Sequence, residues 1–344
     1  MKILPDVKLD FSDVLIRPKR SELSSRSEVD LEREFIFRHS KRVWKGIPIM
    51  VANMDCTGTI EMFRVLSKYK MITCLHKFYE PEDYPMDMDP NYYMITSGIR
   101  DNDWEKLQKT IERLNPYFVC VDVANGYSSK LIDYVKKFRA KYPDITLMAG
   151  NVVTNEMTEE LVLQGVDIVK VGIGPGSVCL TRKLTACGFP QLSAIMDTAD
   201  AAHGVNALIC GDGGVQFPGD FSKGFGAGAD FMMAGSMFSG HEESGGEMVV
   251  EGDKKFKLFY GMSSKKAMVK NYGKMESYRS SEGKVVKIPY KGPVEATVQD
   301  ILGGIRSCMT YIGAKKLKDL SKCTTFIRVN RQLNEIYSHP GYST

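Results

Sequence analysis

Eight short apolar runs recur along the chain from residue 47 onward. Each run is rich in Val, Ile, Phe and Met and is apolar almost throughout, rather than alternating with polar residues. This pattern is typical of strands that are buried on both faces of a parallel sheet. The predicted strands occupy residues 47–54, 71–78, 92–99, 117–126, 145–153, 166–174, 206–214 and 229–238.

Amphipathic segments of helical length separate these runs. Residues 101–114 place Trp104, Leu107, Ile111 and Leu114 on one apolar stripe behind an Asp cap. The other predicted helices cover residues 128–143, 154–165 and 293–317. Eight strands with their crossovers predict an α/β fold, a (β/α)8 TIM barrel. An open doubly wound sheet is disfavoured, because the usual G-x-G-x-x-G after the first strand is missing.

Two segments lie outside the repeat of this single predicted domain, 1–344. Residues 1–46 form a lead-in that we expect to plug or edge the bottom of the barrel. Residues 239–292 separate the eighth strand from the last helix, where a barrel needs only a short loop. Loops of this length are usually functional or disordered, and the aromatic and β-like runs here predict partial order. We expect a catalytic flap, with a purely structural hairpin as the alternative.

The composition narrows the class of protein further. The chain has 344 residues, of which 43% are hydrophobic and 26% charged, with a formal net charge of +4. This small charge does not indicate a nucleic-acid or membrane partner. No signal peptide or apolar run of about 20 residues is found. Eight cysteines are scattered without a C-x-x-C pair, and Cys74, Cys120 and Cys210 lie in strand-like runs. We therefore expect reduced, packed thiols in a cytoplasmic protein.

Glycine-rich turns follow the seventh and eighth predicted strands. These turns are "CGDGGV" and "MAGSM", and "FPGDF" then begins a helix with Pro in its first turn. Backbone N–H groups in such turns bind anions, and barrels often hold a phosphate at this place. Asp212 lies in the first turn and, being acidic, suits the hydroxyl groups of a sugar rather than a phosphate. A phosphate site beside a sugar site indicates a nucleoside monophosphate, although tight packing could explain either turn alone.

The segment "KVGIGPGSVCLTRK" raises the question of a nucleophile. Its glycines adopt backbone conformations closed to other residues, Pro175 stiffens it, and inward carbonyls could bind a monovalent cation. Cys179 follows the strand body, beside Ser177, Thr181 and Arg182, and nearby positive charge is expected to favour its thiolate. Packing is the alternative role. No Ser-His-Asp or Cys-His signature accompanies it, so a covalent role without hydrolysis fits best.

Six motifs together resemble the IMP dehydrogenase/GMP reductase family over nearly the whole chain. They are "KVGIGPGSVCLTR", "DGGVQFPGD", "FGAGADFMMAGSMFSGHEESGG", "FYGMSS", "YRSSEGK" and "DILGGIRSCMTYIGA". Residues 79–91 leave no room for the regulatory CBS pair of the dehydrogenases, and their flap Arg-Tyr pair is absent. The resemblance therefore favours the reductase branch. The alternatives are an IMP dehydrogenase without the CBS insertion and a non-catalytic nucleotide- or RNA-binding barrel.

The resemblance implies NADPH-dependent conversion of GMP to IMP with release of ammonia. Cys179 would attack purine C2, and a Thr181/Glu282 pair would supply the proton as the 2-amino group leaves. Hydride would then displace the sulfur. Glu282 lies on the predicted flap, so flap closure would assemble the site. The resemblance also implies a homotetramer.

The same resemblance implies which residues bind the substrate, the cation and the cofactor. The GMP contacts are Ser177, Asp212, Gly213, Gly214, Gly235, Ser236, Met262, Ser263, Arg279, Ser280 and Gly283. The K+ site comprises Gly174, Gly176 and Cys179, with Arg182 nearby. The NADPH contacts are Lys77, Asp122, Val123, Ala124, Met262, Tyr278, Ser307 and Thr310, with Ser25 and Arg26 from a neighbouring subunit. Ser236 replaces a common glycine and is tolerated if its φ is negative. For Lys77 the alternative is a salt bridge to Asp122.

Overall fold

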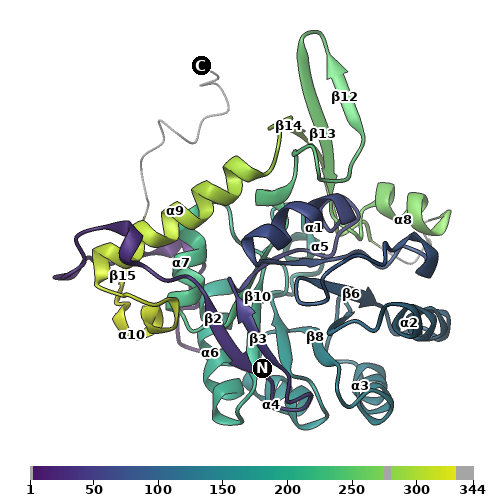
Figure 1. Cartoon of the computed structure of the whole chain (residues 1–344), viewed down its shortest axis with the longest axis horizontal. Helices are drawn as coiled ribbons and strands as arrows, with labels where there is room; N and C mark the ends of the chain where they lie inside the picture. Colours follow the sequence, from purple (N-terminus) through teal and green to yellow (C-terminus); the bar gives the residue numbers. More distant parts are fainter. Residues whose placement is uncertain (1–2, 275–279, 331–344) are drawn as a thin grey trace.

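The barrel strands form a closed parallel ring in the computed structural model, which describes residues 3–274 and 280–330. Their order is β10-β11-β4-β5-β6-β7-β8-β9 (Figure 1). Each of the eight predicted runs contains one of these strands, so the predicted (β/α)8 fold is confirmed. The strands are β4 (Ile49–Val51), β5 (Ile72–Cys74), β6 (Tyr93–Ser97), β7 (Phe118–Asp122), β8 (Thr146–Val152), β9 (Ile168–Val171), β10 (Leu208–Asp212) and β11 (Phe231–Ala234).

Helices cover the outside of the barrel (Figure 1). The crossover from β5 to β6 is an exception, because it contains only a 3-10 turn, η4 (Pro81–Asp83). The predicted last helix is shorter than expected, since Gly313 takes a φ of +76° and ends it. The helices are α1 (Ile60–Leu66), α2 (Asp101–Leu114), α3 (Ser129–Lys141), α4 (Asn155–Leu163), α5 (Thr181–Thr185), α6 (Gln191–Gly204), α7 (Pro218–Gly226), α8 (Lys265–Tyr272), α9 (Glu295–Ile312) and α10 (Leu320–Cys323).

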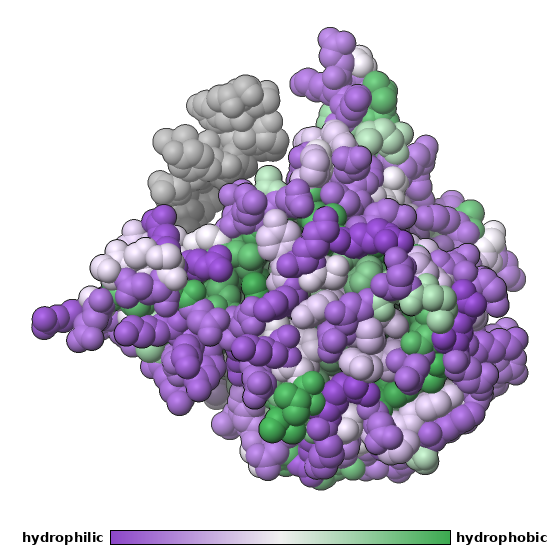
Figure 2. All heavy atoms as spheres, viewed as in Figure 1, coloured by the Kyte–Doolittle hydropathy of each residue, from purple (hydrophilic) through white to green (hydrophobic). Residues whose placement is uncertain are grey.

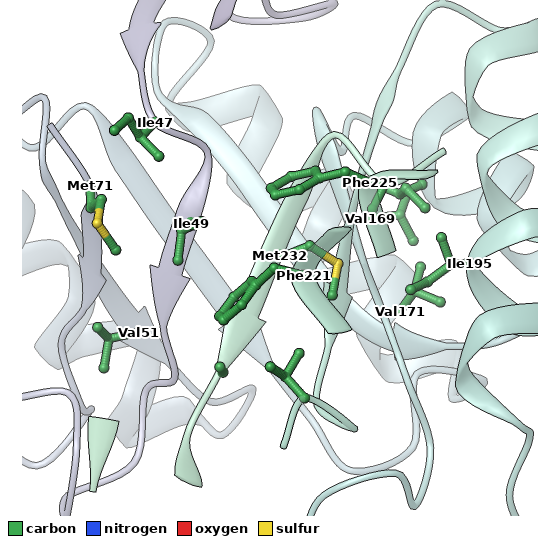
Figure 3. Packing of buried hydrophobic residues seen from close by; sticks show 14 of the residues in the cluster. Ile47, Ile49, Val51, Met71, Val169, Val171, Ile195, Phe221, Phe225 and Met232 are labelled. Carbon is green, nitrogen blue, oxygen red and sulfur yellow. The ribbon is translucent and has the colours of Figure 1, made fainter. Parts of the chain in front are cut away.

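Two apolar layers hold the barrel together. Outward-facing strand residues such as Val51, Val171 and Met232 pack against helix residues such as Ile195 and Phe221 (Figure 3). Inward-facing residues fill the interior and include the three cysteines predicted to be packed, all fully buried. These residues are Met50, Ile72, Cys74, Met94, Phe118, Cys120, Met148, Ile168, Cys210, Phe231 and Met233.

The N-terminal lead-in contributes a hairpin to the barrel bottom. Strands β2 (Arg33–Ile36) and β3 (Val43–Gly46) pair antiparallel. Their aromatic residues Phe35, Phe37 and Trp44 join the interior cluster and contact Phe118 and Phe231, at the N-terminal ends of strands. The lead-in also pairs with a segment that follows α10, because β1 (Val14–Ile16) lies antiparallel to β15 (Phe326–Arg328).

The long insertion between β11 and α9 forms a small sheet. Strands β12 (Met248–Glu251), β13 (Lys254–Tyr260) and β14 (Val285–Pro289) pair antiparallel in that order, and the β12–β13 hairpin projects from the body (Figure 1). The insertion also carries α8. Hydrophilic residues dominate the face of the molecule seen in Figure 2. Within residues 3–274 and 280–330, no helix is long and apolar enough to cross a bilayer.

Candidate active site

Cys179 lies on the loop between β9 and α5, at the C-terminal end of the barrel strands. Its backbone N–H donates to the carbonyl of Gly176 at 3.0 Å and closes a tight turn. The loop leaves the strand through Gly172, whose φ is +148°. A Cβ at Gly172 would lie 2.4 Å from the carbonyl oxygen of Asp212, so glycine is required for the loop to cross the end of β10.

Three side chains form a hydrogen-bonded chain at this loop. The Sγ of Cys179 lies 3.2 Å from Oγ1 of Thr181, and that oxygen lies 2.6 Å from Oε2 of Glu282. An ionised carboxylate only accepts hydrogen bonds, so the Thr181 hydroxyl donates to Glu282 and accepts from the thiol. The arrangement is a proton path from sulfur to carboxylate. The structure thus brings together the three residues predicted to be catalytic.

The insertion reaches this loop through backbone pairing. Cys179 forms an isolated antiparallel bridge with Gly283. The N–H of Leu180 donates to the Glu282 carbonyl at 2.6 Å, and the N–H of Lys284 donates to Val178 at 2.9 Å. A Cβ at Gly283 would lie 2.8 Å from the Ser264 nitrogen, so this crossing also requires glycine. The pairing explains how a residue of the insertion reaches the thiol.

A buried lysine joins two predicted site residues at the barrel mouth. The ammonium of Lys170 is 3% exposed, lies 3.0 Å from Asp122 and pairs with Asp212. Asn151 accepts from Lys170 at 3.1 Å and donates to Asp212 at 2.9 Å. Burial opposes the Lys170 charge, but the two carboxylates raise the pKa of Lys170 well above its usual value. Burial likewise opposes the Asp122 charge, yet Lys170 lowers the pKa of Asp122. The buried ammonium therefore stays charged and stabilises the ionised form of Asp122.

The sequence analysis missed Lys170 and Asn151. The usable signal was a lysine inside an otherwise apolar strand, because such a charge must be paired when buried. The alternative salt bridge between Lys77 and Asp122 is not among the ion pairs of the described residues. The Lys77 ammonium instead lies 5.8 Å from the Tyr272 ring centre, although its charge also lowers the pKa of Asp122.

The predicted phosphate turns lie beside the cysteine loop. A Cβ at Gly213 would lie 3.2 Å from the Pro175 ring, so the two turns touch. Ser236 begins the 3-10 helix η5 (Ser236–Phe238), and its hydroxyl donates to the Val215 carbonyl at 3.2 Å. Ser236 is not among the described residues with positive φ, so the replacement of glycine is tolerated as expected.

The other residues predicted to bind substrate or cofactor differ in where they lie. Ser177, Ser263 and Ser280 are exposed near the mouth, and Met262 packs with the cluster that contains Val178. Val123 and Ala124 follow β7. Tyr278 and Arg279 lie outside the described residues.

Four predicted cofactor residues gather away from this mouth. Ser25 and Arg26 belong to the 3-10 turn η2 (Arg26–Glu28) and its cap, which lies against α9. Ser307 and Thr310 lie on α9, about 18 and 22 Å along the helix from its start. The contact between η2 and α9 brings together the two elements that carry these four residues, and neither element contributes to the hydrogen-bonded chain at Cys179.

A parallel barrel with a thiol, a hydroxyl and a carboxylate in line at its C-terminal end defines the class as (β/α)8-barrel enzymes. A family profile described as "IMP dehydrogenase / GMP reductase domain" matches residues 91–339. The chain belongs to this family, and the resemblance inferred from its motifs is confirmed.

Curated relatives match along almost the full chain. GMP reductase 2 of Homo sapiens is 56% identical over 339 residues, covering 97% of each chain. GMP reductase of Caenorhabditis elegans is 54% identical over 343 residues, covering 98% of this chain and 96% of the relative. GMP reductase of Citrobacter koseri is 53% identical over 347 residues, covering 98% and 99%.

Proposed function

We propose that the protein is a GMP reductase, which converts GMP to IMP and ammonia with NADPH through a covalent bond between Cys179 and purine C2. The observation that carries this proposal is the hydrogen-bonded chain from Cys179 through Thr181 to Glu282. The names of the full-length relatives support the same substrate. Purine nucleotide salvage is the corresponding role.

The proton path accounts for the first half of the reaction. The thiol proton passes through Thr181 to Glu282 as sulfur adds to C2 of the purine. The same path returns a proton to the 2-amino group, so the C2–N bond breaks and ammonia leaves. NADPH, when bound, supplies the hydride that replaces sulfur at C2. The C2–S bond then breaks, and Cys179 regains its thiolate.

Neighbouring groups suit the remainder of a nucleoside monophosphate. Lys170 and Asn151 orient the Asp212 carboxylate, which suits it as an acceptor for ribose hydroxyls. The N–H groups of the glycine turns suit the phosphate. We assign substrate binding to Ser177, Asp212, Gly213, Gly214, Gly235, Ser236, Met262, Ser263, Arg279, Ser280 and Gly283.

Residues at the mouth of the barrel also support the proposed cofactor and cation sites. Lys77 has no carboxylate partner among the described ion pairs, and Asp122 lies near it, which fits a polar, phosphate-bearing cofactor. Lys77 and Asp122 would contact NADPH together with Val123, Ala124, Met262 and Tyr278. Because η2, with Ser25 at its cap and Arg26 in it, lies against α9, which carries Ser307 and Thr310, we propose that these four residues serve a neighbouring subunit of a homotetramer. The turn closed by Cys179 and Gly176 suits K+ at the carbonyls of Gly174, Gly176 and Cys179, beside Arg182. A cytoplasmic location fits the unpaired cysteines.

Absorbance of the nicotinamide band tests the reaction directly. We expect NADPH oxidation with GMP and equal release of ammonia, and no reduction of NAD+ with IMP. Cys179→Ala should abolish turnover while GMP still binds, because sugar and phosphate contacts do not involve sulfur. NAD+ reduction with IMP would favour the dehydrogenase instead. Unchanged turnover by Cys179→Ala would exclude the covalent step.

A further inference from the structure

Residues 8–11 of the N-terminal lead-in lie beside the cysteine loop, at the opposite end of the barrel from the β2–β3 hairpin. Leu9 and Ser193 exchange two hydrogen bonds, at 2.8 and 3.1 Å. Phe11 is 3% exposed, and its ring would lie 3.3 Å from a Cβ at Gly214, in the predicted phosphate turn. This segment is therefore packed against the site.

Asp10 forms a bridge between two points of the loop. Its carboxylate accepts from both terminal nitrogens of Arg182, at 2.8 and 3.4 Å. The same carboxylate accepts from the backbone N–H of Gln191 at 2.5 Å. Arg182 lies three residues after Cys179, and Gln191 begins α6. One side chain therefore ties the loop that follows the nucleophile at both of its ends.

Arg182 transmits this restraint to the glycine segment before Cys179. Its guanidinium also donates to the Phe189 carbonyl at 2.5 Å. Its Cγ would lie 2.5 Å from a Cβ at either Gly174 or Gly188, so the stem is clasped between the two glycines. Without Asp10, the guanidinium would lose its ion pair while confined in this position.

Gln191 transmits the restraint to the barrel strands. Its side chain is fully buried and donates to the Val171 carbonyl at 2.9 Å and to the Asp212 carbonyl at 3.2 Å. These two carbonyls end strands β9 and β10. The hydrogen-bond network therefore runs from the lead-in, through Asp10 and Gln191, to the strand ends that carry the nucleophile loop and Asp212.

We propose that Asp10 is a positioning residue for Cys179. It touches no reacting atom, but it fixes residues 172–190 so that the thiol stays in line with Thr181 and Glu282. The catalytic consequence rests on the proposed function, whereas the effect on the loop does not. Misplacement of a reacting group by about 1 Å lowers turnover about 100-fold.

The test compares Asp10→Ala, Asp10→Asn and Lys8→Ala in the full chain. Lys8 lies on the same segment, but its ion pair is with Asp197 on α6, at 3.0 Å. Its ammonium lies 5.6 Å from the Phe189 ring centre and forms no hydrogen bond with the loop in the described part of the chain. We expect Asp10→Ala to lower kcat about 10–100-fold with little change in KM for GMP. Asp10→Asn keeps an acceptor for Gln191 and should fall between Asp10→Ala and wild type. Lys8→Ala should match wild type.

Alkylation by iodoacetamide measures the loop independently of catalysis. Trypsin places Cys179 and the fully buried Cys120 in different peptides, so each is followed by mass spectrometry. We expect Asp10→Ala to change the labelling rate of Cys179 at least several-fold, with Cys120 unchanged.

The proposal would be overturned if Asp10→Ala had the labelling rate and kcat of wild type. It would also be overturned if the labelling rates of Cys179 and Cys120 rose equally, because that result indicates general unfolding. If the wild-type protein shows no GMP turnover, the proposed function fails while the labelling still decides the role of Asp10.

Discussion

Glu282 differs from the other carboxylates of the insertion because it ends the hydrogen-bonded chain from Cys179, along which we propose that the thiol proton moves. In Glu282→Gln, the amide oxygen still accepts from Thr181, but the group cannot take the thiol proton. We expect GMP binding to persist and ammonia release to fall about 10²–10⁴-fold. Isothermal titration and an ammonia assay measure the two quantities. Glu247→Gln removes an exposed carboxylate of the same insertion, which pairs with Lys266, and is the control. Full ammonia release by Glu282→Gln would contradict the assignment.

At the same scale, motifs and hydrophobic patterns differ in what they predict. Cys179, Thr181 and Glu282 could be named because they belong to motifs, although Thr181 and Glu282 are 101 residues apart. Lys170 is the first residue of the motif that contains Cys179, but the motif assigned it no role, because a window dominated by Val and Ile places it within a strand. Its role depends on Asp122 and Asp212, which approach it only when β7, β9 and β10 lie in one barrel.

Among the elements, α8 joins the insertion to the segment that follows β4, because Lys270 on α8 contacts Asp55 there. Lys270 donates to Asp55 at 2.8 Å and to the Tyr260 hydroxyl at 3.1 Å, and the Asp55 side chain is only 3% exposed. Although burial opposes its charge, these bonds raise the pKa of Lys270. Burial, together with the charge of Asp55, raises the pKa of Tyr260 to about 12. The cluster therefore holds α8 in place at neutral pH.

Lys270→Met should loosen α8 because it leaves the buried Asp55 carboxylate without its cation. We expect a local loss of about 1–3 kcal/mol, seen as faster cleavage of residues 261–274 by protease while the thermal midpoint changes little. Lys266→Met lies on the same helix but removes only a surface pair with Glu247, so it is the control. Equal cleavage of both variants would exclude the cluster as a restraint.

The order and type of the barrel strands followed from the sequence, but their boundaries did not, because each predicted run extends past both ends of its strand. The strands were predictable because each is apolar on both faces, and α2 was predicted with its exact bounds. The crossover from β5 to β6 lacks an α-helix because Pro81, Pro85 and Pro90 interrupt it. The pairing of Cys179 with Gly283 could not be predicted, since neither residue lies in a patterned strand and only the folded barrel brings them together.

For the whole molecule, the lead-in connects both ends of the barrel. Residues 8–11 lie at the mouth, whereas the β2–β3 hairpin closes the bottom. There Asp230 accepts from the Ile209 N–H at 3.0 Å, from His203 at 2.8 Å and from Arg33 at 3.4 Å. This buried carboxylate fastens β2 to β10 and α6, so a titration of His203 reports on global stability.

The hydrogen bond to Asp230 outweighs burial and raises the pKa of His203 above its unfolded value of about 6.5. The contribution of His203 to the free energy of unfolding is therefore complete below that unfolded value and is lost as pH rises through the folded pKa. The side chain is 45% exposed, so we expect at most about 1 kcal/mol. In urea unfolding, the stability advantage of wild type over His203→Gln should shrink as pH rises above the unfolded value of about 6.5.

His39 provides a control of opposite sign, because burial lowers the pKa of His39. Protonation of His39 disfavours the folded state, so its advantage over His39→Gln should grow as pH rises through the unfolded value. The His203 profile should therefore fall with pH while the His39 profile rises. A His203 profile that stays flat or rises would show that the hydrogen bond to Asp230 does not raise the pKa of His203.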